Sequence, residues 1–299
     1  MTKAPPDYLT TREVAELIRL KERKVYDLVA SGAIPCVRVT GKLLFPRALI
    51  EAWLARHAEY GGGAETLQPR PRICAGSHDP LLDWALREAG TQLAVSFGGS
   101  LAGLRAMAEA QAQMAGVHLV EDGEGEAAWN LQHVQRALPG QPVVLIEWAR
   151  RQQGLIVAPK NPLKLKGIAD LEGRRIIGRQ RAAGAFVLLE KLLAGKGLAI
   201  GDLKLAEAPA LTEADVAAAV SEGRADAGLG IAAVAHQYRL GFVPLTLERY
   251  DLAVWRAAYF DEPVQKLLAF ARTERFAERA KALTGYDISG LGTVRYNAP

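Results

Sequence analysis

In the first 58 residues of the chain, apolar residues recur at helical spacing in some segments and at strand spacing in others. Thr10 followed by Glu13 predicts the capped start of a helix, because each side chain can accept a hydrogen bond from the other residue's backbone N–H. A second short helix is expected after a break at Leu20–Lys21, and it should end at Gly32, where a positive φ angle costs little. The inward positions of these helices are predicted to be Val14, Leu17, Ile18, Val25, Leu28 and Val29.

Strand spacing replaces helical spacing around Thr40-Gly41-Lys42 and predicts a two-stranded hairpin. Pro46 is placed as the first residue of a third helix, where its missing N–H breaks no bond. The apolar positions are Val37, Val39, Leu43 and Phe45 in the hairpin, and Leu49, Ile50, Trp53 and Leu54 in the helix. The predicted order is therefore helix, turn, helix, hairpin, helix.

A linker is predicted over residues 59–71, because three consecutive glycines and a Pro-x-Pro sequence cannot build a core. It separates a domain at 1–58 from a larger one at 72–299. In the larger domain strands alternate with helices, which is typical of parallel α/β layers, and its length favours two lobes. The predicted strands are Ile73–Ala75, Leu93–Val95, Val143–Ile146, Leu155–Val157, Arg175–Ile177 and Ala227–Leu229, and the helical segments are 100–112, 184–194 and 212–222.

The formal net charge of +4 lies entirely in the first 58 residues, which hold 10 Lys or Arg and 6 Asp or Glu, against 27 of each sign in the rest. A local cationic excess favours an anionic partner, with nucleic acid as the first candidate. No apolar run is long enough to span a membrane and no signal core is visible at the start, so a cytoplasmic location is expected. Cys36 and Cys74 lie in apolar runs and are expected to be buried thiols.

The first domain carries a set of short motifs in a fixed order: Thr10 to Ala15, Val25-Tyr26, Ser31 to Pro35, and Trp53-Leu54. With these motifs it resembles the excisionase/MerR-type domain, an α+β winged helix-turn-helix that binds double-stranded DNA. The second helix would enter a major groove and the hairpin would act as the wing. The candidate DNA contacts are Lys21, Arg23, Lys24 and Tyr26 on the helix, and Arg38 and Lys42 on the hairpin. Because Glu22 and Asp27 weaken the local field, a homodimer on two half-sites is expected.

Three helix N-termini are predicted directly after strands in the second domain, at residues 76–80, 98–103 and 179–184. Each combines small residues with a hydroxyl or guanidinium group. Helix N-termini leave backbone N–H groups unpaired and carry a favourable dipole, so converging termini can bind an oxyanion without a metal.

Several motifs of the second domain match one family: Ser77 to Pro80, Gly116 to Leu119, Gln153 to Pro159, Asn161-Pro162, Arg179 to Arg181, Gly223 to Ile231 and Glu248 to Asp251. Over about residues 72–290 the chain resembles the PBP-like domain, which is often fused to helix-turn-helix or molybdopterin-biosynthesis modules and is similar to periplasmic molybdate-binding proteins. The resemblance implies an α/β two-lobed type II periplasmic-binding-protein fold, with lobe 1 at about 72–148 and 249–299 and lobe 2 at about 154–245.

The same resemblance implies molybdate, tungstate or a related molybdenum-cofactor species as the ligand, and no covalent cofactor. The implied ligand contacts are Ser77 and Ser100 from lobe 1, Arg181, Ala183 and Gly184 from lobe 2, and Tyr250 at a lobe crossover. Asp226 is expected to brace the fold. His78 and His118 are expected to be structural, with sensing of pH or a metal as the alternative, and Arg150-Arg151 is expected to be a solvated or interface pair.

These features predict a transcription regulator rather than an enzyme: an anion closes the lobes and shifts the spacing of two winged helices in a dimer. One alternative is an excisionase-like architectural protein with a passive second domain. Another is an enzyme of molybdenum-cofactor metabolism, which is disfavoured because the sequence has no GxSxG, HExxH, P-loop or CxxC motif.

Overall fold

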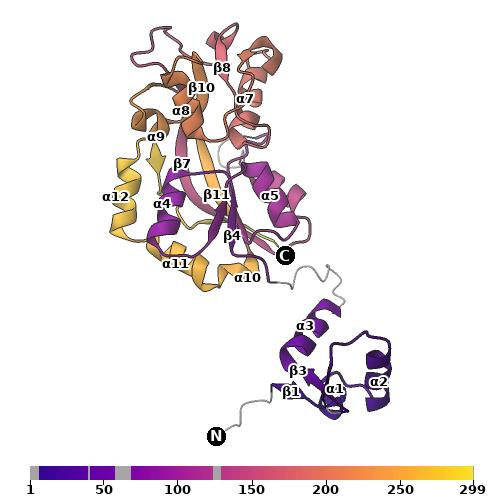
Figure 1. Cartoon of the computed structure of the whole chain (residues 1–299). Helices are drawn as coiled ribbons and strands as arrows, with labels where there is room; N and C mark the ends of the chain where they lie inside the picture. The colour runs from indigo at the N-terminus through magenta and orange to yellow at the C-terminus, as the bar shows by residue number, and fades with distance from the viewer. Residues whose placement is uncertain (1–6, 40, 58–68, 124–128, 299) are drawn as a thin grey trace. The chain divides into compact units, whose positions relative to one another are not determined.

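The computed structural model describes residues 7–39, 41–57, 69–123 and 129–298. They form two compact units, Met1–Pro69 and Arg70–Pro299 (Figure 1). Residues 59–68 of the predicted linker lie outside the described residues. Arg70 belongs to the second unit rather than to a linker, because its guanidinium donates to the Met107 carbonyl at 2.7 Å and lies over the Trp255 ring.

The first unit has the predicted order of elements around a three-stranded sheet, β1-β3-β2. Its elements are β1 (Tyr8–Leu9), α1 (Thr11–Leu17), α2 (Glu22–Ala30), β2 (Val37–Val39), β3 (Lys42–Pro46) and α3 (Arg47–His57). The predicted capping box is present, with Glu13 N–H donating to Thr10 Oγ1 and Thr10 N–H to Glu13 Oε2. Gly32 follows α2 with φ +67°, as predicted. Pro46 was placed wrongly: it ends β3 opposite Tyr8, and α3 begins one residue later.

The small core of the first unit is built from β1, the three helices, β3 and Ile34 in the loop before β2. Its buried members are Leu9, Val14, Ala15, Val25, Ile34, Phe45 and Ile50. Three predicted apolar positions are wrong as core positions: Leu17 is 44% exposed, Val37 is 41% exposed and Leu49 is 47% exposed. The face of α1 that meets the core runs through Val14, Ala15 and Ile18, so Leu17 at the last turn points past it.

A single mixed sheet runs through the second unit in the order β5-β4-β6-β11-β7-β10-β8-β9. Its strands are β4 (Ile73–Gly76), β5 (Ala94–Ser96), β6 (Met114–Val117), β7 (Val143–Val157), β8 (Arg175–Ile177), β9 (Lys204–Leu205), β10 (Ala227–Ile231) and β11 (Gly241–Trp255), with β12 (Tyr286–Asp287) and β13 (Val294–Asn297) added beside β7. The predicted parallel pairing holds at both flanks, β5-β4-β6 and β10-β8-β9. The centre is antiparallel, because β11 pairs with both β6 and β7, and β7 with β10.

Two long strands join the two lobes (Figure 1). The sequence predicted separate strands at 143–146 and 155–157, but β7 continues through both, and β11 runs antiparallel along its whole length. Lobe 1 holds β4–β6 and one end of this pair, and lobe 2 holds β8–β10 and the other end. The space between the lobes therefore lies over the middle of β7 and β11.

Helices cover both flanks of the sheet (Figure 1). Those of lobe 1 are α4 (Pro80–Glu88), α5 (Ser100–Ala108), α6 (Leu131–Ala137), α10 (Arg256–Tyr259), α11 (Glu262–Phe270) and α12 (Glu274–Ala282). Those of lobe 2 are α7 (Gly184–Ala194), α8 (Glu213–Ser221) and α9 (Ala232–Gln237), with the 3-10 turns η3 (Ile168–Leu171) and η4 (Ile200–Asp202). Among the described residues no helix has both the length and the apolar content to cross a membrane.

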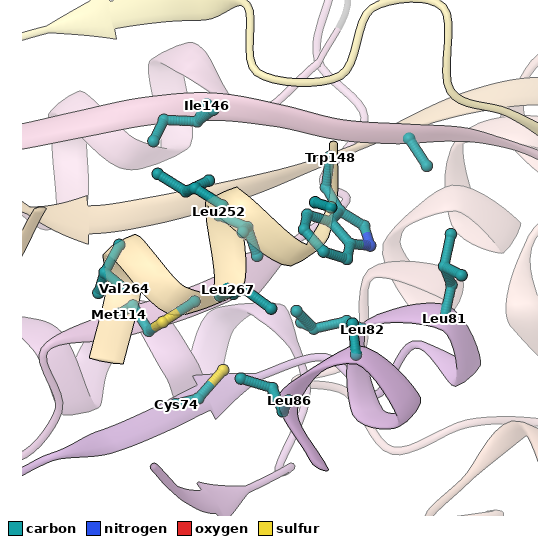
Figure 2. Packing of buried hydrophobic residues seen from close by; sticks show 14 of the residues in the cluster. Cys74, Leu81, Leu82, Leu86, Met114, Ile146, Trp148, Leu252, Val264 and Leu267 are labelled. Carbon is teal, nitrogen blue, oxygen red and sulfur yellow. The ribbon is translucent and has the colours of Figure 1, made fainter. Parts of the chain in front are cut away.

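The largest apolar cluster lies in lobe 1, where α4 and α11 pack on the sheet (Figure 2). The labelled members are Cys74, Leu81, Leu82, Leu86, Met114, Ile146, Trp148, Leu252, Val264 and Leu267. Cys74 is fully buried there, as predicted, and burial raises the pKa of its thiol to about 12. Cys36 is only partly buried. The start of α4 is thus held firmly against β4, which fixes one wall of the interlobe space.

Candidate functional site

The six side chains predicted to contact DNA are exposed on the first unit. Lys21 is the N-cap of α2, and Arg23 and Lys24 lie in its first turn. Arg38 lies on β2, and Lys42 begins β3. The helix and the hairpin therefore both present cations to solvent, as a reading helix and its wing require.

A hollow of about 690 Å³ lies between the start of α1, α2 and the hairpin. Tyr26, Arg38 and Lys42 line it, so the structure brings these three predicted residues together, whereas Lys21, Arg23 and Lys24 lie outside its lining. Arg12 also lines the hollow, and sequence reasoning missed it. The sequence feature that could have identified Arg12 is its position two residues after the helix-capping Thr10. In such domains the first helix crosses the DNA backbone.

The second unit brings the three predicted helix N-termini to the region between the lobes, and one of them is capped by a side chain. Asp79 caps α4 by accepting the Leu82 N–H at 2.7 Å, so a carboxylate already occupies that terminus. Helices α5 and α7 begin after Gly99 and Ala183, and neither has a side-chain cap within the described part of the chain. Their first N–H groups have no partner inside the helix.

The starts of α5 and α7 touch each other across the lobes. The Leu101 N–H, in the first turn of α5, donates to the Ala182 carbonyl at 3.1 Å. Gly184 packs against His118: a Cβ at this position would lie 2.9 Å from the imidazole Nε2, and closer still to the His118 carbonyl. Of the predicted lobe-2 residues, Ala183 and Gly184 are therefore buried at the point where the lobes meet.

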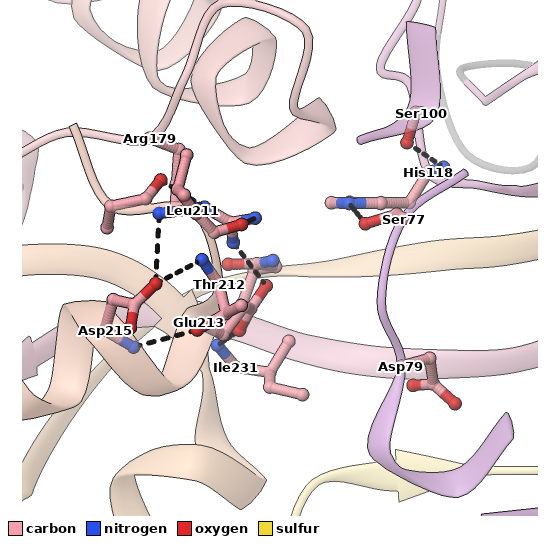
Figure 3. Close-up of polar contacts among 12 residues, drawn as sticks. Ser77, Asp79, Ser100, His118, Arg179, Leu211, Thr212, Glu213, Asp215 and Ile231 are labelled. Atoms are coloured by element: carbon pink, nitrogen blue, oxygen red, sulfur yellow. Dashed lines mark hydrogen bonds and ion pairs between the residues drawn. The ribbon is translucent and has the colours of Figure 1, made fainter. Parts of the chain in front are cut away.

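Ser77 and Ser100 converge on the same histidine (Figure 3). Ser77 Oγ lies 2.9 Å from His118 Nε2, and Ser100 Oγ accepts the backbone N–H of His118 at 3.2 Å. Because Ser100 accepts this bond, its own hydroxyl proton stays available to a further acceptor. The structure thus brings the two predicted serines together and adds His118, which the sequence placed among structural residues.

Arg181 is not part of this group, because its side chain is exposed. Of the two arginines in this loop, the buried one is Arg179, which is 6% exposed. Arg179 Nε donates to the Ala210 carbonyl at 3.2 Å, and its Nη1 lies 3.8 Å from Glu213 Oε1. Residue 179 forms a parallel bridge with Ala210, and this backbone contact decides which of the two arginines faces inward.

Tyr250 lies on β11 near the crossover, as predicted, but its hydroxyl is already used. It donates to the Ser77 carbonyl, and the side chain is fully buried. The ring stacks on His118 with centroids 6.0 Å apart, and the Arg151 guanidinium lies 4.4 Å from its centroid on a cation–π contact. Tyr250 therefore positions Ser77 and His118 rather than donating to a ligand.

A charged cluster that sequence reasoning missed forms the floor of the interlobe space. Arg151 and Glu248 are opposite each other in the register of β7 and β11, and their side chains form a fully buried ion pair. Arg151 also donates to Asp79 at 3.0 Å, and Tyr286 donates to the same carboxylate. Arg150-Arg151 was expected to be a solvated or interface pair, and the solvated alternative is wrong for Arg151, which is fully buried. We call Ser77, Asp79, His118, Arg151 and Glu248 the interlobe cluster.

Electrostatics keeps Arg151 and Glu248 ionised. Burial opposes the charge on Glu248, but Arg151, His118 and the bonds from His118 and Gln153 together lower its pKa to about 2. Burial likewise acts against the charge on Arg151, and Glu248 and Asp79 more than offset it, which raises the Arg151 pKa. A cation and two carboxylates therefore share a water-poor site, where their mutual attraction is strong.

Comparisons with known proteins agree with this architecture. A family model described as a PBP superfamily domain matches residues 84–272, and one described as a helix-turn-helix domain matches residues 8–58. The protein YvgK of Bacillus subtilis (strain 168), described as uncharacterized, is 27% identical over 302 residues, which covers 95% of this chain and 96% of YvgK.

Solved structures resemble the second unit in fold. A putative phosphate ABC transporter substrate-binding protein with bound phosphate, from Clostridium perfringens, has a TM-score of 0.51 at 13% identity and covers 73% of this chain and 99% of its own. The regulatory domain of MetR, a LysR family regulator from N. meningitidis, has a TM-score of 0.49 at 15% identity, covering 73% of this chain and 99% of its own. With its family match spanning more than half of the sequence, the chain belongs to the PBP superfamily domain family and carries a helix-turn-helix domain before it.

Proposed function

We propose that this protein is a transcription regulator in which a small oxyanion, bound between the lobes, changes the affinity of the helix-turn-helix domain for DNA. One observation carries the proposal: the uncapped starts of α5 and α7 meet beside Ser77, Ser100 and His118. Backbone N–H groups at helix starts, together with hydroxyl donors, stabilise an anion without a metal. The anion would bind both lobes at once and thereby favour their closed arrangement.

Molybdate or tungstate is the ligand we propose, with phosphate as the competitor to be tested beside them. All three are small tetrahedral anions that match a site built from short donors. The resemblance of the second unit to molybdate-binding proteins favours the first two. The bound phosphate of the Clostridium perfringens protein keeps phosphate in the comparison.

A passive second domain, as in an architectural DNA-binding protein, is less well supported. Buried polar and charged side chains gather at the interlobe cluster. Buried ionic groups cost desolvation free energy, so a purely structural domain gains little from placing them there.

Hydrolysis is a third candidate, because Ser77, His118 and Glu248 follow the bonding order of a nucleophile, a base and a carboxylate. Two observations disfavour it. Ser77 is only 3% exposed, and its own N–H donates to the Gly116 carbonyl at 2.8 Å instead of facing a developing oxyanion. Ser77, held in place by His118 and Glu248, serves better as a fixed donor for an anion.

The test is a titration of operator binding with each anion. The full chain is mixed with the promoter DNA upstream of its own gene, and DNA affinity is measured by fluorescence anisotropy with and without molybdate, tungstate or phosphate. We expect one class of anion to change DNA affinity by about 5- to 150-fold, the usual range of allosteric coupling. A homodimer is part of the proposal, and light scattering of the DNA complex measures it.

Ser100→Ala is the matched site variant, and Ser221→Ala, at the exposed end of α8, is its control. Ser100→Ala removes a hydroxyl donor to a charged ligand, which is worth about 1.5–3 kcal/mol, so anion affinity should fall at least about tenfold. Ser221→Ala should leave it unchanged. Anion binding that does not alter DNA affinity would reject the regulator, and no anion binding by calorimetry or thermal shift would reject the sensor.

A further inference from the structure

His118 lies at the centre of a three-residue hydrogen-bonded chain that the proposed function does not yet explain. Its Nδ1 lies 2.7 Å from Glu248 Oε2, and its Nε2 lies 2.9 Å from Ser77 Oγ. All three side chains are buried. The imidazole is therefore held by both ring nitrogens, and its protonation state decides what Ser77 can do.

Counting donors along the chain fixes the two possible states. An ionised carboxylate only accepts, so Glu248 requires a proton on Nδ1. In neutral His118 the other nitrogen, Nε2, is then an acceptor, and Ser77 must donate its single hydroxyl proton to it. In the imidazolium, Nε2–H donates to Ser77, and the Ser77 proton is released for another acceptor.

Residues from four segments of the second unit surround His118. Ser77 faces it from the turn before α4, Ser100 from α5, Gly184 from α7, and Glu248 and Tyr250 from β11. Burial raises the pKa of the Tyr250 hydroxyl, so this ring stays neutral.

The charges bonded to His118, directly or through Glu248, are those of Glu248, Arg151 and Asp79. Arg179 and Glu213 stand on the lobe-2 side (Figure 3). Two carboxylates with one arginine leave one negative charge in the interlobe cluster, and an imidazolium at His118 balances it.

The two states suit two kinds of anion. An aprotic dianion such as molybdate has only acceptor oxygens, so it needs the Ser77 proton and hence the imidazolium. Hydrogen phosphate carries its own proton, which it can donate to Ser77 while Ser77 donates to neutral His118. We propose that His118 matches the site to the protonation of its anion: molybdate binds with uptake of one proton at His118, and hydrogen phosphate binds without it. This proposal rests on the proposed function, since it concerns the same site.

Calorimetry in several buffers tests the proposal with the full chain. Sodium molybdate and sodium phosphate are titrated separately at a series of alkaline pH values, in buffers of different ionisation enthalpy. The slope of the observed heat against that enthalpy gives the number of protons taken up. We expect molybdate to bind with uptake of about one proton and phosphate with uptake of about zero. Molybdate affinity should therefore fall about tenfold for each unit by which the pH is raised.

Two variants and one control separate His118 from other groups. His118→Gln should abolish the buffer dependence and weaken molybdate binding, while His236→Gln, an exposed histidine at the end of α9, should keep a slope of one proton. Glu248→Gln keeps His118 but lets an amide donate to Nδ1, which leaves Nε2–H on the neutral ring. Its molybdate slope should therefore also fall to about zero. This variant decides the question if His118→Gln does not fold.

The failures of the two proposals are distinguishable. Molybdate binding with no buffer dependence in the unmodified protein, or with the same slope in His118→Gln, overturns the role of His118 and leaves the sensor intact. A slope of one proton for phosphate as well overturns the discrimination between anions. Failure of every anion to bind overturns both proposals.

Discussion

At the level of single residues, Glu248 connects most of the polar groups between the lobes. It accepts hydrogen bonds from Arg151, His118 and Gln153 while fully buried. Such a group is stable only when ionised and paired, because an uncompensated buried charge is costly. The low pKa of Glu248, about 2, expresses that pairing.

Glu248→Gln should therefore lower stability in a pH-dependent way. The pKa of Glu248 falls from 4.5 to about 2 on folding, so its contribution is present above pH 4.5 and is lost as pH falls through about 2. Near neutral pH we expect the variant to be about 3–5 kcal/mol less stable, the usual cost of breaking a buried pair. The difference should shrink across this acid range.

Urea unfolding of the full chain at neutral and acid pH measures the effect. Glu278→Gln, at an exposed position of α12, is the control and should show almost no difference at either pH. A difference for Glu248→Gln that stays constant as the pH is lowered would contradict the pairing described for this carboxylate.

At the level of elements, the start of α7 joins the lobes because its first residue has no side chain. Gly184 approaches His118 so closely that a Cβ would clash with it. Gly195, the C-cap of the same helix, has φ −63° and only ordinary contacts, at 3.6 Å. A glycine-to-alanine substitution at the start of α7 is therefore expected to disturb the contact between the lobes, whereas the same substitution at its end is not.

Gly184→Ala should weaken anion binding by at least about tenfold, because the added methyl group holds α7 away from His118 and Ser77. Gly195→Ala should leave binding unchanged and raise stability by up to about 1 kcal/mol, since its backbone conformation suits alanine. Calorimetry gives the affinities, and thermal unfolding gives the stabilities. Equal affinities in the two variants would show that close contact between α7 and His118 is not needed.

Signals from residues near in sequence predicted most of the helices and strands, but they could not predict the ion pair of Arg151 and Glu248. The capping box at Thr10, the turn at Gly32 and the start of α7 at Gly184 depend on neighbours within a few residues. Arg151 and Glu248 are 97 residues apart, and only the register of two long strands makes them partners. Without knowledge of that pairing, an Arg-Arg dipeptide looks like a surface pair.

The choice between Arg179 and Arg181 failed for the same kind of reason. Both arginines lie in one short loop, and periodicity cannot orient side chains where there is no regular element. The backbone bridge from Arg179 to Ala210, 31 residues away, turns Arg179 inward. Ser77 and Ser100 lie near each other because each follows a strand of the same parallel group, whose carboxyl ends share one edge of the sheet.

At the level of the whole molecule, the charge is divided between the two units. The formal excess of +4 lies in the first 58 residues, and the remainder is balanced. Binding to DNA through phosphate contacts releases counterions, so affinity should depend steeply on salt. Only cations of the first unit should contribute to that dependence.

Lys24→Ala should reduce the slope of log affinity against log salt by about one, because it removes one phosphate contact from the first turn of α2. Lys196→Ala removes the same charge from an exposed position of lobe 2 and should leave the slope unchanged. Anisotropy titrations over a range of salt concentrations measure both. Equal slopes in the two variants would place the DNA contacts elsewhere.

The pairing of β11 with β7 shifts register at two places, between Pro244 and Thr246 and between Tyr250 and Asp251. Strands bend most easily at such irregularities, and the stretch between them, which carries Glu248 opposite Arg151, is regular. Rotation of one lobe against the other can thus be absorbed at the two ends of this stretch without breaking the ion pair. If the protein binds the proposed anion, its donors on lobe 1 would already be in their binding orientation before the lobes close. The binding free energy would then serve to bring α7 against them.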